Sequence, residues 1–416
     1  MPRRVFITVA EVSGDKHAAQ LVRCLRQLDP EMIIEGHGGP EMAAAGARIH
    51  HETVCGAAMG LRAALRAVEM YRLLRWTRRY FDSGNRPDLL IGVDSPSMNF
   101  HFARVAHQRR IPVLQYVAPQ LWAWQEWRIR KVRRWVDRLA CILPFEEEYF
   151  RRHGVNATFV GHPLFDHLPD ARADAAATPG FPHRPPVIGL LPGSRRSEAQ
   201  ANFPHQLDVA ARIFGQFPRA RFVVPTTPAT DPVVRQVLRG ADAALRDATQ
   251  TGLDRFDELV PRCDLCITVS GTATLHVAGH GVPMIVVYRG SRILWHLLGR
   301  WLVRTRTYAL VNLLSDFHDH IVPEFVPWYG SNQPVAECAL AMLREPKKLE
   351  QQRARLRHLV QSLDKPGASM NVARMAMEMM AGAHGLREGS ASPFAEIGAS
   401  KQNPQPQPLP GYRERA

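Results

Sequence analysis

The chain lacks the features that mark secreted and membrane-spanning proteins. Its 416 residues include only six cysteines, a density too low for a disulfide-based fold, so we expect a reducing cytoplasm. Only six apolar or near-apolar residues separate Pro2-Arg3-Arg4 from Glu11, which is too short for a signal peptide. No run approaches the roughly 18 apolar residues of a spanning helix.

Signatures of metal and nucleic-acid binding are also missing. Cys263 and Cys266 form a CxxC pair, but no second pair or nearby histidine completes a zinc set, so we expect structural cysteines and no metal. The 53 Lys and Arg exceed the 39 Asp and Glu, giving a net charge of +14. This excess predicts an anionic partner or surface, but zinc-finger spacing, RNA-binding motifs and a lysine-rich tail are absent, which disfavours nucleic acid.

Apolar runs alternate with helical stretches along most of the chain. In the first half, strands are predicted at 5–10, 32–35, 89–93 and 113–117, with a helix at 16–28 and a loop at 36–40. The pattern restarts in the second half with strands at 187–191, 222–225, 265–269 and 284–288. This alternation predicts an α/β protein with two doubly wound parallel sheets, and a ligand between their facing carboxyl ends.

Composition marks the boundaries between these parts. A connector rich in Ala, Asp and Pro spans about 168–186, so domains are predicted at 1–167 and 187–347. From Gly385 the sequence turns to Gly, Ser, Pro and Gln. This composition predicts a disordered tail over 385–416.

Two glycine-centred loops in the second half carry the clearest chemical signal. One contains Gly193, Ser194 and Arg195, and the other contains Ser270, Gly271, Thr272, Ala273 and Thr274. Each follows an apolar run and precedes a helical stretch, so backbone N–H groups would point at an anion, and Arg195 could add a bidentate contact. Together they predict a diphosphate site, although each loop alone could be an ordinary strand-to-helix turn.

The first half offers a carboxylate at the equivalent place. Asp94 ends a buried strand, so its side chain should project from the carboxyl edge of the sheet and could accept a proton from an attacking hydroxyl. The alternative is that Asp94 caps the following helix. After the first strand, Gly14 would let a substrate approach the main chain, Ser13 could bond to a sugar, and Asp15 is expected to cap a helix.

Seven segments, in family order over about residues 5 to 330, resemble lipid-A-disaccharide synthases. They are Ala10-Glu11-Val12-Ser13-Gly14-Asp15, Val93-Asp94-Ser95-Pro96 with Asn99, Tyr116-Val117-Ala118-Pro119-Gln120-Leu121-Trp122-Ala123-Trp124, Leu143-Pro144-Phe145-Glu146, Phe159-Val160-Gly161-His162-Pro163, Leu190-Leu191-Pro192-Gly193-Ser194-Arg195 and Ser270-Gly271-Thr272-Ala273-Thr274. The resemblance implies a glycosyltransferase of family 19 with the GT-B fold, in which two Rossmann-like domains face a central cleft. It also implies that a helical segment at about 348–380 crosses back onto the first domain.

The resemblance also implies a reaction and roles for single residues. The family transfers 2,3-diacylglucosamine from UDP to the 6-hydroxyl of 2,3-diacylglucosamine 1-phosphate, with inversion and release of UDP and without a metal or cofactor. Asp94 occupies the position of the catalytic base. His276 and Asn312 would join the two glycine loops around the donor, and Asn99 and Trp122 would join Ser13 and Gly14 around the acceptor.

Both substrates of that reaction carry acyl chains, which implies peripheral association with the inner membrane. Three basic, aromatic segments point to a membrane independently: 292–304, with Trp295 and Trp301; 61–81, with Trp76 and six arginines; and 122–135, with four tryptophans. We expect the first two to share the membrane contact. Packing against the protein core is the alternative for each segment. The resemblance leaves the oligomeric state open between monomer and homodimer.

Several positions depart from the family pattern. Ser97 stands where a second aspartate is common, and His276 stands where a glutamate is expected to hold the ribose of the donor. Near Asn312, Val311 replaces a usual proline. These departures leave open a GT-B transferase acting on another sugar or acceptor, a UDP-sugar epimerase, and a nonenzymatic protein that binds nucleotide sugars.

Overall fold

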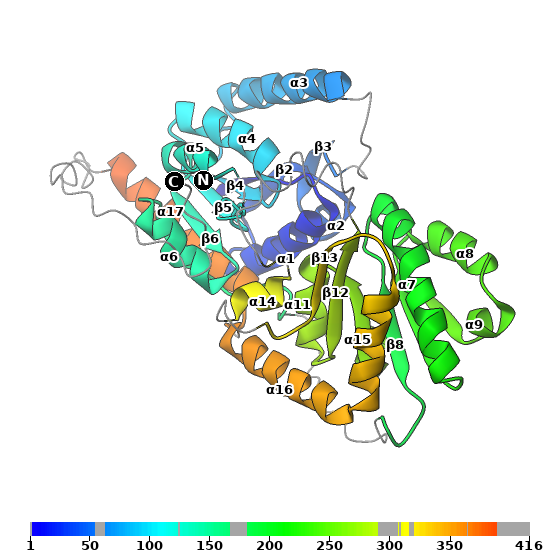
Figure 1. The fold of residues 1–416 in the computed structure, drawn as a ribbon. Coiled ribbons are helices and arrows are strands. Elements are labelled where there is room, and N and C mark those ends of the chain that lie inside the picture. Colours follow the sequence, from blue (N-terminus) through cyan, green and yellow to red (C-terminus); the bar gives the residue numbers. More distant parts are fainter. Residues whose placement is uncertain are drawn as a thin grey trace. The chain divides into compact units, whose positions relative to one another are not determined.

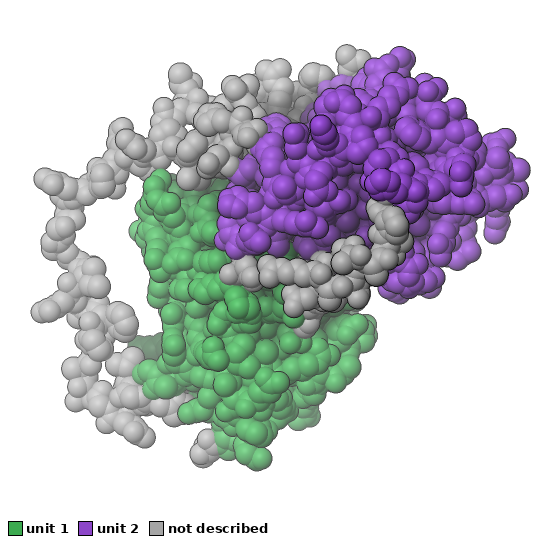
Figure 2. All heavy atoms as spheres, turned by 90° about the horizontal axis from the view of Figure 1, so that it is seen from below, with its two compact units in different colours: residues 1–166, 365–407 green, residues 167–364, 408–416 purple. Residues whose placement is uncertain are grey.

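The computed structural model describes residues 2–54, 63–123, 125–166, 181–289, 307, 309–315, 320–363 and 365–388. The chain forms two units, each with its own parallel sheet (Figures 1 and 2). Unit 1 comprises residues 1–166 and 365–407, and unit 2 comprises residues 167–364 and 408–416. The predicted fold class, two doubly wound α/β domains, is confirmed.

Unit 1 contains a seven-stranded sheet in the order β3-β2-β1-β4-β5-β6-β7. Its strands are β1 (Arg4–Thr8), β2 (Ile33–Gly38), β3 (Arg48–Glu52), β4 (Leu89–Val93), β5 (Val113–Tyr116), β6 (Arg138–Cys141) and β7 (Ala157–Phe159). Its helices are α1 (Val12–Leu28), α2 (Pro40–Ala44), α3 (Ala63–Asp82), α4 (Pro96–Gln108), the short η1 (Glu126–Arg128), α5 (Ile129–Trp135), α6 (Pro144–Arg152) and α17 (Ala368–Glu388).

The C-terminal helix α17 belongs to unit 1, where Val372, Ala376 and Met380 are buried in the same core as α1. Asp166 fixes its beginning, because its carboxylate accepts hydrogen bonds from the backbone N–H groups of Gly367, Ala368 and Ser369, at 2.9 to 3.2 Å. The predicted segment at 348–380 is therefore divided. Its first part lies in α16 (Pro346–Leu363) of unit 2, and only α17 returns to unit 1.

Unit 2 contains a six-stranded sheet in the order β10-β9-β8-β11-β12-β13. Its strands are β8 (Val187–Leu191), β9 (Arg221–Thr226), β10 (Thr249–Leu253), β11 (Leu265–Val269), β12 (Met284–Arg289) and β13 (Glu324–Trp328). Its helices are α7 (Arg196–Gln216), α8 (Asp231–Arg239), α9 (Ala243–Asp247), α10 (Phe256–Leu259), the short η2 (Val260–Arg262), α11 (Thr272–Gly279), α14 (Leu310–Leu314), α15 (Gln333–Arg344) and α16.

One predicted loop is a strand. The glycine-rich stretch 36–40 was expected to leave the sheet, but β2 continues to Gly38. A Cβ atom at Gly36 would lie 1.8 Å from the carbonyl oxygen of Ile7 in β1. Glycine is therefore needed there because the backbones of β1 and β2 pack so closely, and not because the chain turns.

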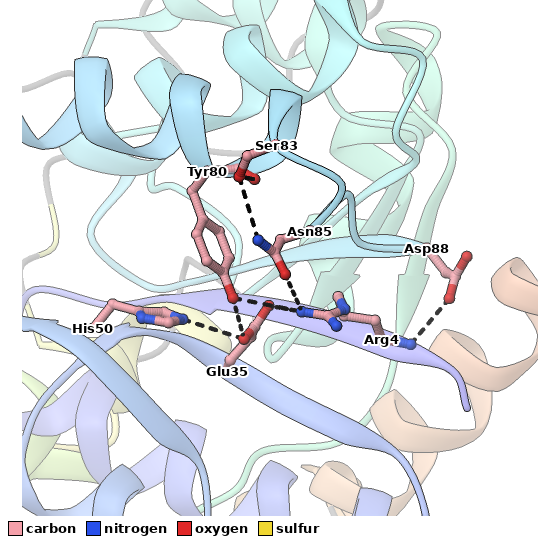
Figure 3. Close-up of polar contacts among 7 residues, drawn as sticks. All are labelled: Arg4, Glu35, His50, Tyr80, Ser83, Asn85 and Asp88. Carbon is pink, nitrogen blue, oxygen red and sulfur yellow. Dashed lines mark hydrogen bonds and ion pairs between the residues drawn. The ribbon is translucent and has the colours of Figure 1, made fainter. Parts of the chain in front are cut away.

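A buried carboxylate on β2, the strand next to the edge strand β3, connects α3 to the sheet of unit 1 (Figure 3). Glu35 of β2 is 1% exposed and accepts hydrogen bonds from Arg4, at 2.9 Å, His50, at 3.2 Å, and Tyr80 of α3, at 2.8 Å. Three donors compensate the loss of water around this carboxylate. Trp76, one turn before Tyr80, stacks on the Tyr80 ring with centroids 4.8 Å apart.

His37 lies beneath the same helix and is held neutral. Its Nε2 is 2.9 Å from the Thr77 hydroxyl, which donates its own hydrogen to the Leu73 carbonyl, so Nε2 carries the ring hydrogen. Nδ1 is buried without a hydrogen-bond partner among the described residues. Protonation would place an uncompensated charge there, and burial lowers the pKa of His37 to about 3.

This shift predicts that unit 1 loses stability in acid. The pKa of His37 is lower in the folded chain than the usual 6.5, so its contribution is complete above pH 6.5 and is lost as the pH falls toward 3. The variant His37→Gln keeps a donor for Thr77 but does not titrate. Its unfolding free energy should therefore change less with pH than that of the wild type, by up to about 1.4 kcal/mol per pH unit. Urea titrations between pH 3 and 7 measure both slopes, and equal slopes would contradict a neutral, buried His37.

Candidate active site

The candidate catalytic edge of unit 1 lies between β1 and β4, where the strand order reverses. In sheets of this type, ligands bind beyond the carboxyl ends of the strands at this switch point. Gly14, in the first turn of α1, packs against the residue that follows β4, because a Cβ at Gly14 would lie 3.2 Å from Cβ of Asp94. Ser13 is exposed at the same edge, and Asp94 is half-buried.

The backbone at Asp94 and Ser95 adopts an uncommon conformation. Both residues are left-handed, with φ of 48° and 42°, which costs about 1–2 kcal/mol for each non-glycine residue. The Ser95 hydroxyl accepts a hydrogen bond from the Ala10 N–H at 3.2 Å, which links this turn to the loop after β1. Strained turns of this kind often occur at functional sites, where surrounding contacts maintain them.

Two buried amides hold the turn from below. Asn99 donates to the Val93 and Asp94 carbonyls at 3.1 and 2.6 Å and accepts from the Thr8 hydroxyl at 2.9 Å. Gln115 donates to the Asp94 carbonyl at 3.1 Å. Both amides approach Gly92, where a Cβ would lie 2.6 Å from Gln115 Oε1 and 3.1 Å from Cβ of Asn99.

These contacts place several predicted acceptor residues below the surface. Asn99 is 1% exposed, and its amide contacts the protein rather than open space. Trp122 is also buried; its indole N–H donates to Glu146 at 3.1 Å, and its ring meets Phe145 edge to face. Burial raises the pKa of Glu146 to about 8, so this carboxyl group is largely protonated at neutral pH.

Asp15 caps a helix, as expected, but the helix that it caps is α2 and not α1, to which Asp15 belongs. Its carboxylate accepts from the backbone N–H groups of Gly39, Glu41 and Met42, at 3.0 to 3.3 Å, at the start of α2. The helix that Asp15 belongs to already begins at Val12. Asp15 therefore joins α1 to α2 beside the candidate edge.

In unit 2, the two glycine loops follow neighbouring strands. β8 and β11 pair in parallel and also flank the point where the strand order reverses. The first loop leads into α7 and the second into α11, so the N-terminal N–H groups of both helices lie at one edge of the sheet. Gly193 and Gly271 have φ of 106° and 144°, a region that suits glycine. The structure therefore brings the two predicted phosphate loops together.

Side chains around these loops are held by polar contacts. Arg195 is exposed, and its guanidinium lies 3.2 Å from the carboxylate of Glu198 one turn later. The Thr227 hydroxyl donates to the Ser194 carbonyl at 3.2 Å, and the Thr274 hydroxyl donates to the Gly271 carbonyl at 2.8 Å. Arg195 thus lies at the rim of the loop, where an anion would compete with Glu198 for its guanidinium.

The two remaining predicted donor residues differ in placement. His276, in α11, is half-buried, and its Nε2 lies 2.5 Å from Oδ1 of Asp257 in α10. Asn312 is fully buried. Its side-chain amide donates to the Val322 carbonyl and to the Glu324 carboxylate, and its amide oxygen accepts from the Val322 N–H. Asn312 therefore joins α14 to β13 and does not present its amide at the surface.

The sequence interpretation missed Thr8, Gln115 and Asp257. Thr8 and Gln115 lie within ordinary apolar strands, and the only signal was Gly92, a strand glycine that often marks a close approach. Asp257 precedes His276 by 19 residues and belongs to no glycine loop. Its proximity depends on how α10 and α11 pack.

Part of the predicted membrane surface is outside the described residues, including Trp295 and Trp301. Trp76 is described, and its half-buried ring packs on His50, His51 and Tyr80, with centroids 4.7 to 4.9 Å apart. The predicted membrane role of this ring does not fit that inward position. Within the described ranges, no helix combines the length and the apolar character needed to cross a bilayer.

Comparison with solved structures agrees with the observed fold. UDP-GlcNAc 2-epimerase from Neisseria meningitidis, solved with UDP-GlcNAc, is 12% identical, with a TM-score of 0.57 over 92% of this chain and 100% of that one. The glycotransferase of kitacinnamycin is 14% identical, with a TM-score of 0.60 over 91% of this chain and 100% of that one. At such low identity, these similarities establish the fold alone.

Comparison of sequences is more specific. Lipid-A-disaccharide synthases from Geobacter sulfurreducens and Nitrosococcus oceani are 35% and 32% identical to this chain over 91% of its length and over 97% and 96% of theirs. The family model described as lipid-A-disaccharide synthetase matches residues 5–377, a range that includes the Asp94 turn and both glycine loops. The protein therefore belongs to the lipid-A-disaccharide synthase family.

Proposed function

We propose that the chain transfers 2,3-diacylglucosamine from UDP to the 6-hydroxyl of 2,3-diacylglucosamine 1-phosphate. The observation that carries this proposal is the family match over residues 5–377, because it spans the edges of both units. As a member of this family, the chain is a UDP-sugar glycosyltransferase. The epimerase alternative has support from the shared fold and from the departures at Ser97 and His276, and the binding-protein alternative has support only from those departures.

Asp94 is the proposed general base. Its carboxylate would accept the proton of the 6-hydroxyl as that oxygen attacks the anomeric carbon, while the bond to UDP breaks on the opposite face. A single displacement of this kind inverts the anomeric centre. The rigid support of the turn at Asp94 would keep the carboxylate at a fixed position while the acceptor binds.

The glycine loops of unit 2 are the proposed diphosphate site. Negative charge grows on the leaving UDP, and the N–H groups at the starts of α7 and α11 would stabilise it together with Arg195. His276 is the proposed ribose contact, and its ring is oriented by Asp257. Asn312, whose amide is buried between α14 and β13, would stabilise this part of unit 2 without contacting the donor.

Helix α3 is the part of the proposed membrane surface that lies within the described residues. Val68 and Tyr71 are 49% and 61% exposed, and exposed arginines follow at 72, 75, 78 and 79. Among the described residues, none of these four arginines has an acidic partner within ion-pair distance. Apolar residues beside uncompensated cations suit a headgroup layer that contains anionic lipids.

Asp94→Asn should abolish most turnover without affecting the nucleotide site. Loss of a general base lowers kcat by about 10²- to 10⁴-fold, whereas the affinity for UDP should stay within about twofold. Mass spectrometry of the disaccharide and calorimetric titration with UDP measure the two effects. Asp82→Asn, which removes only a surface ion pair with Arg109, is the matched control. Full turnover in Asp94→Asn would refute the assignment of the base.

Asn99→Ala tests whether Asn99 supports the base or contacts the acceptor. Removal of the amide leaves two carbonyls and the Thr8 hydroxyl without this partner, so we expect about 2 kcal/mol or more of lost stability and a lower kcat. The KM for the acceptor should hardly change, because the side chain is buried. An increase in that KM at constant kcat would instead show contact with the acceptor.

The double variant Val68→Ser and Tyr71→Ser should weaken binding to membranes. Loss of exposed apolar area should reduce co-sedimentation with vesicles that contain phosphatidylglycerol several-fold. Leu28→Ser is a matched control, because Leu28 is a 37% exposed apolar residue of the same unit that lies outside the basic, aromatic segments. Equal losses for the two proteins would refute a specific role for α3.

A further inference from the structure

Three metal-ligand side chains converge between α10 and α11 of unit 2. The Nε2 atoms of His276 and His280 lie 2.5 and 2.9 Å from the same oxygen, Oδ1 of Asp257. One ligand atom from each residue lies within 4.8 Å of the others. Among the described residues, no other group of three His, Cys, Asp or Glu side chains is arranged in this way.

The fold determines the directions of these side chains. His276 and His280 are separated by four residues, so both lie on one face of α11 and its C-terminal cap. Phe256, which precedes Asp257 in α10, stacks on the His276 ring with centroids 4.2 Å apart and an interplanar angle of 24°. The two imidazole rings are also nearly parallel, at 22°. A site whose rings are held by packing binds a ligand with little loss of side-chain entropy.

Charge around the cluster is compatible with a cation. Arg255 and Arg262, the basic residues nearest in sequence to Asp257, both form ion pairs with Glu258. Both guanidinium groups therefore bind the Glu258 carboxylate and not Asp257, and that carboxylate offsets one of their two positive charges. One carboxylate and two neutral imidazoles would bring a single negative charge to a divalent ion.

We propose that Asp257, His276 and His280 bind one divalent transition metal ion, for which Zn²⁺ is the natural probe. Imidazole nitrogen suits Zn²⁺, Co²⁺ and Ni²⁺ better than Mg²⁺ or Ca²⁺, which prefer oxygen ligands. Three protein ligands leave at least one coordination position for water. This proposal does not rest on the transferase activity, because it concerns binding of the ion alone.

The side chains of the cluster must shift apart to hold such an ion, and their ligand atoms already lie within 4.8 Å of one another. Ligand atoms about 2.0–2.1 Å from a tetrahedral metal are about 3.3 Å apart, slightly more than the present contacts with Asp257. The Asp257 side chain is 57% exposed and the His276 side chain 23% exposed, so both can shift outward, whereas His280 is 1% exposed and anchors the site. In the protein without metal, both Nε2 atoms carry hydrogen and donate to Asp257. Metal binding would move each ring hydrogen to Nδ1.

The experiment uses the full chain without a polyhistidine tag, after removal of metals with a chelator and in the absence of nucleotide. Isothermal titration with Zn²⁺ at pH 7.5 should show one site. Asp257→Ala and His276→Gln should each weaken the affinity by at least about tenfold. Titration with Co²⁺ should produce a visible absorption band in the wild type that both variants lack. Asp257 and His276 are the preferred positions because their side chains are not fully buried and their replacement should preserve folding.

His358→Gln is the matched control, because His358 is an exposed histidine of the same unit in α16. This variant should bind Zn²⁺ as the wild type does. The proposal is refuted if the wild type shows no stoichiometric site, or if Asp257→Ala binds as tightly as His358→Gln. In either case the cluster would be only a hydrogen-bonded connection between α10 and α11.

Discussion

Both candidate sites depend on the reversal of strand order within each sheet. In unit 1 the chain adds strands outward from β1 on one side and from β4 on the other, and α1 and α4 pack on opposite faces. The carboxyl ends of β1 and β4 are therefore left uncovered by the helices that follow them. The same reversal separates β8 from β11 in unit 2. Gly14, Asp94 and the two glycine loops lie at these reversal points, where the helices on opposite faces leave the strand ends open to a ligand.

The candidate sites of unit 1 and unit 2 hold their backbone conformations in different ways. In unit 1, side chains position the backbone: Asn99 and Gln115 bind the carbonyl of Asp94 and compensate a strained turn. In unit 2, glycine frees the backbone, so that Gly193 and Gly271 adopt positive φ and the helix N-termini face outward. A base requires one fixed carboxylate, whereas a diphosphate requires several N–H donors. The local structure of each edge thus matches the chemistry proposed for it.

The sequence predicted eight of the thirteen described strands, the two loops and the family, because each depends on local patterns: apolar runs, glycine after a strand, and short motifs. The strands β3, β6, β7, β10 and β13 were not predicted. Nor did the sequence predict which face a side chain takes. Asn99 and Trp122 belong to family motifs, yet both point into unit 1, since their directions follow from the helix and loop that carry them. The continuation of β2 through Gly36 depends on the closeness of β1, and the contact between Asp257 and His276 depends on the packing of α10 against α11. Long-range packing of this kind leaves no local signal.

For the segment at 61–81, the sequence left core packing and membrane contact as alternatives. In α3 the two are compatible, because they involve different faces of the helix. The inner face carries Trp76, Thr77 and Tyr80, which contact the histidines and Glu35 of the sheet. The outer face carries Val68 and Tyr71, at a helical spacing from the exposed Arg75 and Arg78. A helix that inserts apolar side chains into a headgroup layer must resist being pulled from its own protein. The buried contacts of Glu35 and Thr77 would supply that resistance, so the membrane surface proposed for α3 would depend on polar groups that lie beneath it and do not contact lipid.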